Sequence, residues 1–166
     1  MNKDIDLAAL KYSIYLISLL MLGASCTSAK KLSAREKKIK KIVATSRSFV
    51  GTPYRWGGTT RTGMDCSGLL LISFQSAGIN LPRTSKDQSK IGKGVKIKEL
   101  EPGDLVFFAA KKNRRKITHV GMVTEVKGKK EIMFIHASSS LGVIENNLLS
   151  NYYKGIFVKA RRPFFD

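Results

Sequence analysis

The chain has 166 residues, and its 30 lysines and arginines against 12 aspartates and glutamates give a formal net charge of +18. This length is enough for one domain with a real core and leaves no room for a series of domains. A positive field of this size requires polyanionic surroundings, which excludes a protein that works among neutral partners.

Residues 1–25 are expected to be an export signal, because a short polar start is followed by an apolar core and by small residues just before Cys26. The apolar core, residues 14–22, is shorter than the roughly 20 residues of a transmembrane helix. Leu22-Gly23-Ala24-Ser25-Cys26 resembles a bacterial lipobox, although the leucine stands four residues before the cysteine rather than three. The resemblance implies that Cys26 is lipidated. An ordinary cleaved signal with an incidental cysteine is the alternative.

The predicted export signal distinguishes between the classes of polyanion that could surround this chain. The signal is neutral, so the mature part keeps the whole charge of +18. Nucleic acid is therefore not expected as a partner, and the cell envelope, with its anionic lipids and acidic wall peptides, is favoured. The densest basic cluster, residues 111–116, is expected in a hairpin loop, where a solvated loop is preferred to a substrate or membrane contact.

The first half of the mature chain predicts helices. Residues 26–33 are expected to be a lipidated tether. Ser33 and Glu36 match a capping box, and apolar residues at helical spacing predict a helix over residues 34–49. A second apolar helix is predicted over residues 66–77, ended by a glycine, and Thr84 is expected to cap a short third helix.

The second half predicts strands. β-branched and aromatic residues concentrate in runs separated by basic or glycine-containing turns. The predicted strands cover residues 104–109, 117–126, 131–137, 143–145 and 155–162, with a helical turn at residues 152–153. Helices followed by an antiparallel meander predict an α+β domain over residues 34–166, with the N-terminal helices packed on an antiparallel sheet.

Cys66, His119 and His136 suit nucleophilic chemistry. A thiol and an imidazole are the smallest set that makes a nucleophilic thiolate, and a second imidazole can orient the first. Cys66 is expected in the first turn of its helix, where free amides and the helix dipole favour thiolate. The two histidines are the only ones in the chain and stand at similar distances from the turn near residue 128, so they can be neighbours across a strand pair.

Taken singly, these residues have ordinary explanations. A lone buried cysteine is usually inert, and a lone strand histidine is usually structural. A metal site and a cofactor are not expected, because one cysteine and two histidines offer three ligands without a closely spaced pair. Asp65 could simply cap the helix. Trp56 is expected to pack rather than to form a stacking platform, and the glycines at 57, 58, 63 and 68 to let backbone approach a peptide substrate.

A series of spaced motifs resembles the NlpC-type cell-wall cysteine peptidases, which have a papain-like fold. The motifs occur in order from about residue 40 to 164, over nearly the whole mature chain. They are Tyr54-x-Trp56-Gly57-Gly58, Asp65-Cys66-Ser67-Gly68, Leu81-Pro82-Arg83-Thr84-Ser85-x-x-Gln88, Pro102-Gly103-Asp104-Leu105-Val106-Phe107-Phe108, Thr118-His119-Val120-Gly121-Met122 and Phe134-Ile135-His136-Ala137-Ser138.

The resemblance implies a role for each matching residue. Cys66 corresponds to the nucleophile, His119 to the base and His136 to the polar third member. Tyr54 corresponds to the tyrosine whose hydroxyl helps the oxyanion site. Asp65, Ser67 and Arg83 correspond to substrate contacts near the nucleophile.

The expected function is a lipid-anchored peptidoglycan endopeptidase that acts through an acyl-enzyme. The resemblance leaves two bonds open, the D-Ala–diaminopimelate crosslink and the γ-D-Glu–diaminopimelate bond. The expected partners are peptidoglycan stem peptides and, through Cys26, a membrane. Because Thr27 is not an inner-membrane retention aspartate, the outer membrane is the expected location, with the protein facing the periplasm as a monomer. A non-catalytic wall-binding lipoprotein and an acyltransferase on the same fold remain alternatives.

Overall fold

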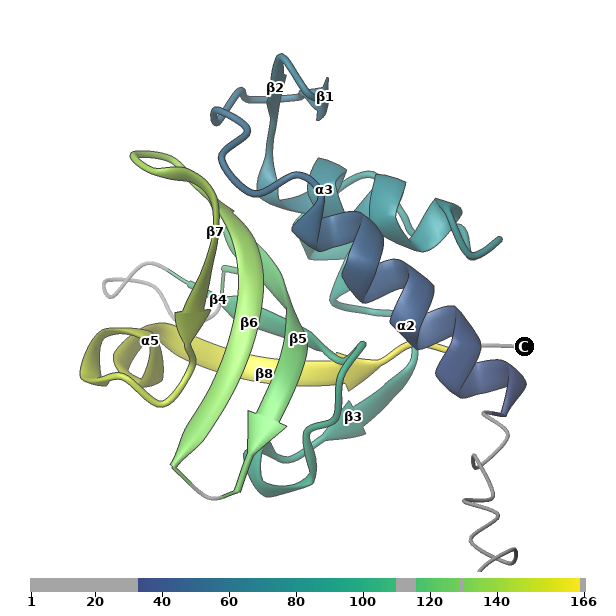
Figure 1. The fold of residues 1–166 in the computed structure, drawn as a ribbon. Helices are drawn as coiled ribbons and strands as arrows, with labels where there is room; N and C mark the ends of the chain where they lie inside the picture. The colour runs from purple at the N-terminus through teal and green to yellow at the C-terminus, as the bar shows by residue number, and fades with distance from the viewer. Residues whose placement is uncertain (1–32, 110–115, 129, 165–166) are drawn as a thin grey trace, which may run out of the picture. The chain divides into compact units, whose positions relative to one another are not determined.

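The computed structural model describes residues 33–109, 116–128 and 130–164. The predicted signal, the lipidation residue Cys26, its tether up to residue 32 and most of the basic cluster lie outside these residues. The described helices occur on both sides of the main sheet (Figure 1). They are α2 (Ala34–Arg47), α3 (Cys66–Gln75), α4 (Ser85–Gln88), a 3-10 helix η1 (Ile97–Glu99) and α5 (Asn151–Ile156). None of the helices in the described part is long and apolar enough to span a bilayer.

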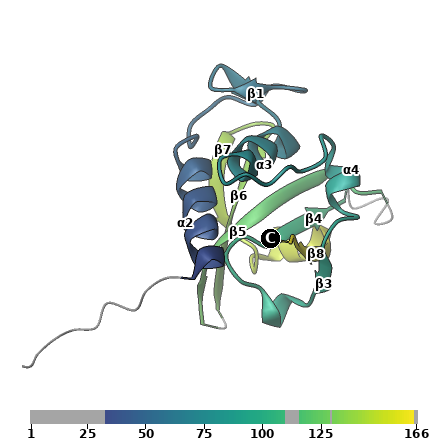
Figure 2. The same ribbon diagram turned by 90° about the vertical axis from the view of Figure 1, so that its right-hand side faces the viewer.

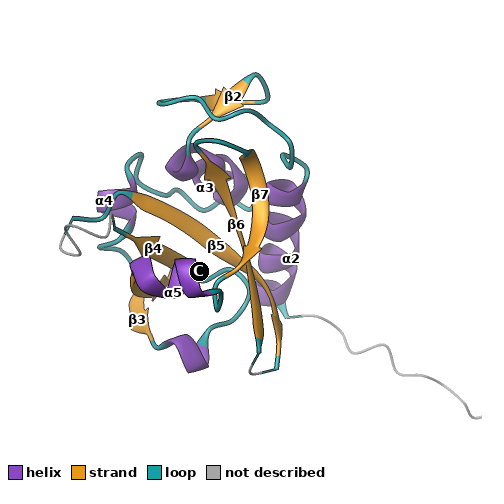
Figure 3. Ribbon diagram, turned by 90° about the vertical axis from the view of Figure 1, so that its left-hand side faces the viewer, coloured by secondary structure: helices purple, strands orange, loops and turns teal. Residues whose placement is uncertain are grey.

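The main sheet has six strands, all paired antiparallel, in the order β3-β8-β4-β5-β6-β7. A separate two-stranded ribbon lies in the loop before α3 and stands apart from this sheet (Figure 3). The strands are β1 (Thr59–Thr60), β2 (Gly63–Met64), β3 (Lys93–Val95), β4 (Leu105–Phe108), β5 (His119–Lys127), β6 (Glu131–Ser138), β7 (Gly142–Asn147) and β8 (Phe157–Arg162). The predicted meander is confirmed for β4 to β7, but β8 returns to the other side of β4 rather than pairing with β7.

Alternating side chains give the sheet a hydrophobic core on each face. On β4, Leu105 and Phe107 join the core under α2 and α3, while Val106 and Phe108 join a second core with α5 and η1. The same alternation continues on β5 and β6. Figure 2 shows α3 beside α2 on its face of the sheet. Every residue of β4 is buried, so side chains on both faces of this strand need a core to pack against.

Local signals set the helix starts as the sequence predicts. The Ser33 hydroxyl accepts from the Glu36 amide, and the Glu36 carboxylate accepts from the Ser33 amide, which completes the capping box of α2. Asp65 caps α3 and Thr84 caps α4. Gly78 follows α3 with φ of 76°, a conformation that glycine adopts without strain. The predicted ends of α2 and α3 each extend about two residues too far.

Two residues of the sequence motifs, Asp104 and Gln88, hold parts of the fold together. The carboxylate of Asp104 is fully buried and accepts from Arg162 at 2.7 and 2.8 Å, which ties the start of β4 to the end of β8. The Gln88 amide donates to the carbonyl oxygens of Ser67 and Pro82 at 3.1 and 2.9 Å. These two hydrogen bonds of Gln88 hold the first turn of α3 against the segment that leads into α4.

Candidate active site

Cys66 is the first residue of α3, and only 7% of the residue is exposed. Burial raises the pKa of the Cys66 thiol, while hydrogen bonds from the backbone amides of Val120, Ser67 and Cys66 itself work in the opposite direction. The helix start thus offers the amides that the sequence predicts, but burial outweighs them. The raised pKa means that the cysteine is a protonated thiol at neutral pH. Its contact with the Val120 amide places the sulfur beside the first residues of β5.

The two histidines form a hydrogen-bonded pair. His119 Nε2 lies 2.9 Å from His136 Nδ1, and the two rings are perpendicular with centroids 4.9 Å apart. The expectation that they are neighbours across two antiparallel strands is therefore confirmed. His136 also stacks on the ring of Phe134 at a centroid distance of 4.9 Å.

Gly121 makes room for the ring of Phe134. A Cβ atom at Gly121 would come within 2.5 Å of the Phe134 ring and 2.9 Å of the Ile135 carbonyl oxygen. The space beside Gly121 is thus filled by the aromatic ring on which His136 lies. This glycine supports the site indirectly, because a side chain here would displace that ring.

Burial keeps both imidazoles neutral. It lowers the pKa of His119 to about 3, with a smaller contribution from repulsion by His136 in its charged form. Burial also lowers the pKa of His136, which a hydrogen bond to Asn146 partly offsets. A neutral imidazole has one nitrogen with a hydrogen and one with a lone pair, so the resting site combines a thiol with two neutral rings.

Two residues beyond the predicted set complete the hydrogen-bond chain. His136 Nε2 lies 2.9 Å from Asn146 Oδ1 on β7 and 3.0 Å from the hydroxyl of Tyr153 on α5. That hydroxyl in turn donates to Asn146 Oδ1 at 2.9 Å. Neither residue could be predicted from the sequence, because neither stands in a motif and only the pairing of β6 with β7 and the position of α5 bring them together.

The two histidines line an open cleft of about 630 Å³. Its other walls come from Tyr54, the end of β4, the end of β6 and the aromatic residues of α5. The pKa of Tyr54 is raised by burial first and then by the negative charges of ionised Cys66 and of Asp65, so its phenol stays protonated. A neutral phenol is a hydrogen-bond donor, and the role of Tyr54 at the oxyanion site stays a prediction.

Asp65, Ser67 and Arg83 hold one another. Asp65 Oδ1 accepts from the Gly68 amide at 2.6 Å, from the Ser67 hydroxyl at 3.0 Å and from Arg83 at 3.0 Å. Its Oδ2 accepts from the Gly57 amide at 2.9 Å and from Arg83 at 2.6 Å. Burial alone would raise the pKa of Asp65, but the hydrogen bonds, that of Arg83 first, lower it. Substrate contact by these three residues stays a prediction, and Arg83, with 39% of its side chain exposed, is the most open of them.

The glycines of this region serve backbone packing. A Cβ atom at Gly68 would lie 2.3 Å from the carbonyl oxygen of Gly58, and one at Gly58 would lie 2.3 Å from that of Gly63. The loop thus packs directly on the start of α3. The expectation that Trp56 packs is wrong, since 87% of the residue is exposed.

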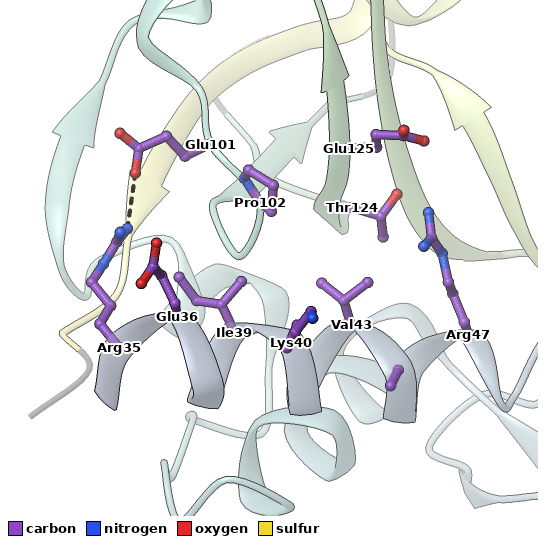
Figure 4. A pocket seen from close by; sticks show the side chains of 11 residues that line it. Arg35, Glu36, Ile39, Lys40, Val43, Arg47, Glu101, Pro102, Thr124 and Glu125 are labelled. Atoms are coloured by element: carbon purple, nitrogen blue, oxygen red, sulfur yellow. Dashed lines mark hydrogen bonds and ion pairs between the residues drawn. The ribbon is translucent and has the colours of Figure 1, made fainter. Parts of the chain in front are cut away.

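A second groove lies between α2 and the sheet, and none of Cys66, His119 and His136 lines it. Its volume is about 690 Å³. Figure 4 shows Ile39 and Val43 of α2 pointing toward Pro102 and Thr124. Ion pairs stand at its rim, among them Arg35 with Glu101 at 2.9 Å. Within the described ranges, no group of three or more His, Cys, Asp or Glu side chains is placed to bind a metal ion.

Comparison with known proteins agrees with this geometry. Residues 51–162 match the NlpC/P60 family, and the chain belongs to that family. It is 37% identical over 154 residues to the probable endopeptidase NlpC of Escherichia coli, covering 90% of this chain and 96% of that protein. It is 40% identical over 113 residues to the murein DD-endopeptidase MepS/murein LD-carboxypeptidase of the same species, covering 68% of this chain and 56% of that protein.

Solved structures support the fold. An NlpC/P60 family protein from Bacillus cereus superposes with a TM-score of 0.67 at 34% identity, over 75% of this chain and 39% of that one. The predicted fold class is confirmed: an α+β domain of the papain-like NlpC/P60 type, with N-terminal helices packed on an antiparallel sheet.

Proposed function

We propose that this protein is a cysteine peptidase that hydrolyses amide bonds in the peptide part of peptidoglycan. The observation that carries the proposal is the joint placement of a buried thiol at the start of α3, next to the Val120 amide, and the hydrogen-bonded His119–His136 pair. The names of the relatives, an endopeptidase and a murein DD-endopeptidase, supply the substrate class.

The reaction begins with attack by Cys66 on the carbonyl carbon of the amide. The sulfur forms the new bond while His119 takes the thiol proton, and the oxygen becomes an oxyanion that the Cys66 amide and the Tyr54 hydroxyl stabilise. The carbon–nitrogen bond then breaks, and His119 returns the proton to the leaving amine. This leaves a thioester between Cys66 and the acyl part of the substrate.

Hydrolysis of the thioester completes the cycle. A water molecule gives a proton to His119 and attacks the thioester carbon, after which the carbon–sulfur bond breaks and the sulfur recovers its proton. Since both imidazoles are neutral at rest, His119 has a lone pair that can accept a proton at each of these two steps. A neutral thiol is compatible with this order of steps, because its proton passes to His119 while the sulfur attacks the carbonyl carbon.

The test is mass spectrometry of purified muropeptides incubated with the protein or with Cys66→Ala. We expect cleavage by the wild type alone, with product masses that distinguish the D-Ala–diaminopimelate crosslink from the γ-D-Glu–diaminopimelate bond. His119→Ala should also abolish turnover, and His136→Ala should reduce it less, because water can partly replace an orienting group. Cleavage by Cys66→Ala at the wild-type rate would refute the mechanism.

Failure of the wild type to cleave would separate the two alternatives. If a small thiol reagent labels the wild type at Cys66 but not Cys66→Ala, a different acyl substrate or an amine acceptor in place of water is indicated. If Cys66 is inert, a non-catalytic wall-binding protein is indicated.

We further propose that residues 1–25 are a signal peptide, that Cys26 carries the lipid and that residues 26–33 tether a catalytic domain of residues 34–166 to the outer membrane, facing the periplasm as a monomer. The lipobox-like residues before Cys26 support this, as does the charge of +18. Cells fed an alkyne-tagged palmitate should label the protein, and Cys26→Ser should abolish the label. An equally labelled variant would rule out Cys26 as the anchor.

A further inference from the structure

We propose that Asn146 and Tyr153 fix the tautomers of both histidines, so that His119 keeps the hydrogen on Nε2 and leaves the lone pair of Nδ1 for the Cys66 thiol. The part of this inference that concerns catalysis rests on the proposed function. The part that concerns tautomers rests on the hydrogen-bond chain from α5 through β7 and β6 to β5.

The chain begins at an atom that can only accept. Asn146 Oδ1 is an amide oxygen, and it receives the hydroxyl hydrogen of Tyr153 at 2.9 Å. It also lies 2.9 Å from His136 Nε2. Two acceptors do not form a hydrogen bond, so His136 must have its hydrogen on Nε2. The hydroxyl oxygen of Tyr153, 3.0 Å from the same nitrogen, is a second acceptor for that hydrogen.

The remaining assignments follow by elimination. A neutral His136 with hydrogen on Nε2 has a lone pair on Nδ1, and this atom lies 2.9 Å from His119 Nε2. The hydrogen of that bond must therefore come from His119. Neutral His119 then has its lone pair on Nδ1, which is the ring nitrogen left for the thiol. Burial keeps both rings neutral, so these tautomers describe the resting protein.

The residues that start the chain are held firmly. Asn146 is the residue of β7 directly opposite Phe134 of β6, the ring on which His136 stacks. The ring of Tyr153 packs edge-on against Phe134 with centroids 4.8 Å apart. Burial raises the pKa of Tyr153, so its hydroxyl keeps the hydrogen that it donates. Turning the Asn146 amide by half a turn would reverse the chain, placing a hydrogen on His119 Nδ1 and removing the base.

The direct test is NMR of the full protein labelled with ¹⁵N-histidine, in which each ring nitrogen shows whether it bears a hydrogen. The chain has only two histidines, and His136→Gln assigns the signals. At pH 7 we expect a hydrogen on Nε2 and none on Nδ1 for both rings. A hydrogen on His119 Nδ1 in the wild type would overturn the proposal.

Matched variants separate an orienting role from a structural one. Asn146→Leu keeps the size of the side chain but removes the acceptor, so we expect mixed tautomers and a kcat lower by roughly tenfold or more with little change in KM. Asn146→Asp keeps the acceptor and should retain both tautomers and activity within about fivefold at pH 8. Tyr153→Phe, which removes one donor to Asn146, should lower kcat by only about two- to fivefold.

The outcomes distinguish this inference from the proposed function. Correct tautomers in a protein that does not cleave muropeptides would leave the inference standing and reject the function. Cleavage combined with unchanged tautomers and kcat in Asn146→Leu would reject the inference and leave the function. Should Asn146→Leu fail to fold, the wild-type spectrum and Asn146→Asp still decide.

Discussion

The hydroxyl of Thr124 is buried without a hydrogen-bond partner among the described residues, although only 5% of the residue is exposed. Thr124 is the extra residue of a β-bulge, because Val123 pairs with Phe134 and Glu125 pairs with Met133. The bulge leaves the side chain facing the groove under α2. A buried hydroxyl that gives up its bonds to water without replacing them opposes folding.

Replacing this hydroxyl should stabilise the protein. Thr124→Val keeps the branched shape that strands favour and removes the unpaired group, so we expect the free energy of unfolding to rise by roughly 1 kcal/mol in urea titrations. Thr45→Val is the matched control, since the Thr45 hydroxyl donates to Ser76 at 3.0 Å and its loss should destabilise. A lower stability of Thr124→Val would mean that a bound water or ligand partners the hydroxyl.

At the scale of elements, the helices could be predicted because their signals are local. The capping box of α2 and the Asp65 and Thr84 caps are readable from a few adjacent residues. The ribbon of β1 and β2 escaped prediction because strands of two residues show no periodicity. The position of β8 beside β4 escaped because it depends on a contact between distant residues, Asp104 and Arg162.

The same distinction between local signals and contacts of distant residues applies to the site. Cys66, His119 and His136 were predicted as a set because each stands in a motif, and the structure brings the two imidazoles within hydrogen-bond distance. Asn146 and Tyr153 carry no sequence signal, since their contact with His136 needs the register of β7 on β6 and the placement of α5. The effect of burial on the thiol was also out of reach, because it depends on how closely α3 packs on β5.

At the scale of the whole molecule, the sheet separates two cores, and each of them supports a different part of the site. Cys66 belongs to the core under α2 and α3, while Phe134, which supports His136, belongs to the core with α5. The thiol and the supported imidazole are therefore held by different parts of the fold. Both groups are buried by the packing of the cores. The chemistry of the site is therefore coupled to the stability of the whole protein.

This coupling predicts how stability depends on pH. The folded pKa of His119 is about 3 against an ordinary value of 6.5, and that of His136 is also lowered. Between these values the unfolded chain binds protons that the folded protein does not, so stability is fully present above pH 6.5 and is lost as pH falls. Each histidine contributes a slope of up to about 1.4 kcal/mol per pH unit. The lowered pKa of Asp65 acts only at more acidic pH, below its ordinary 3.8.

Urea denaturation followed by circular dichroism between pH 7 and 4.5 measures this slope. Tryptophan fluorescence is a poor probe here, because Trp56 is the only tryptophan and is exposed in the folded state. His119→Gln removes one of the two titrating imidazoles, so its stability should fall less steeply with acid than that of the wild type. Equal slopes in the two proteins would mean that His119 is not held neutral by burial, and that the imidazole is charged in part before substrate binds.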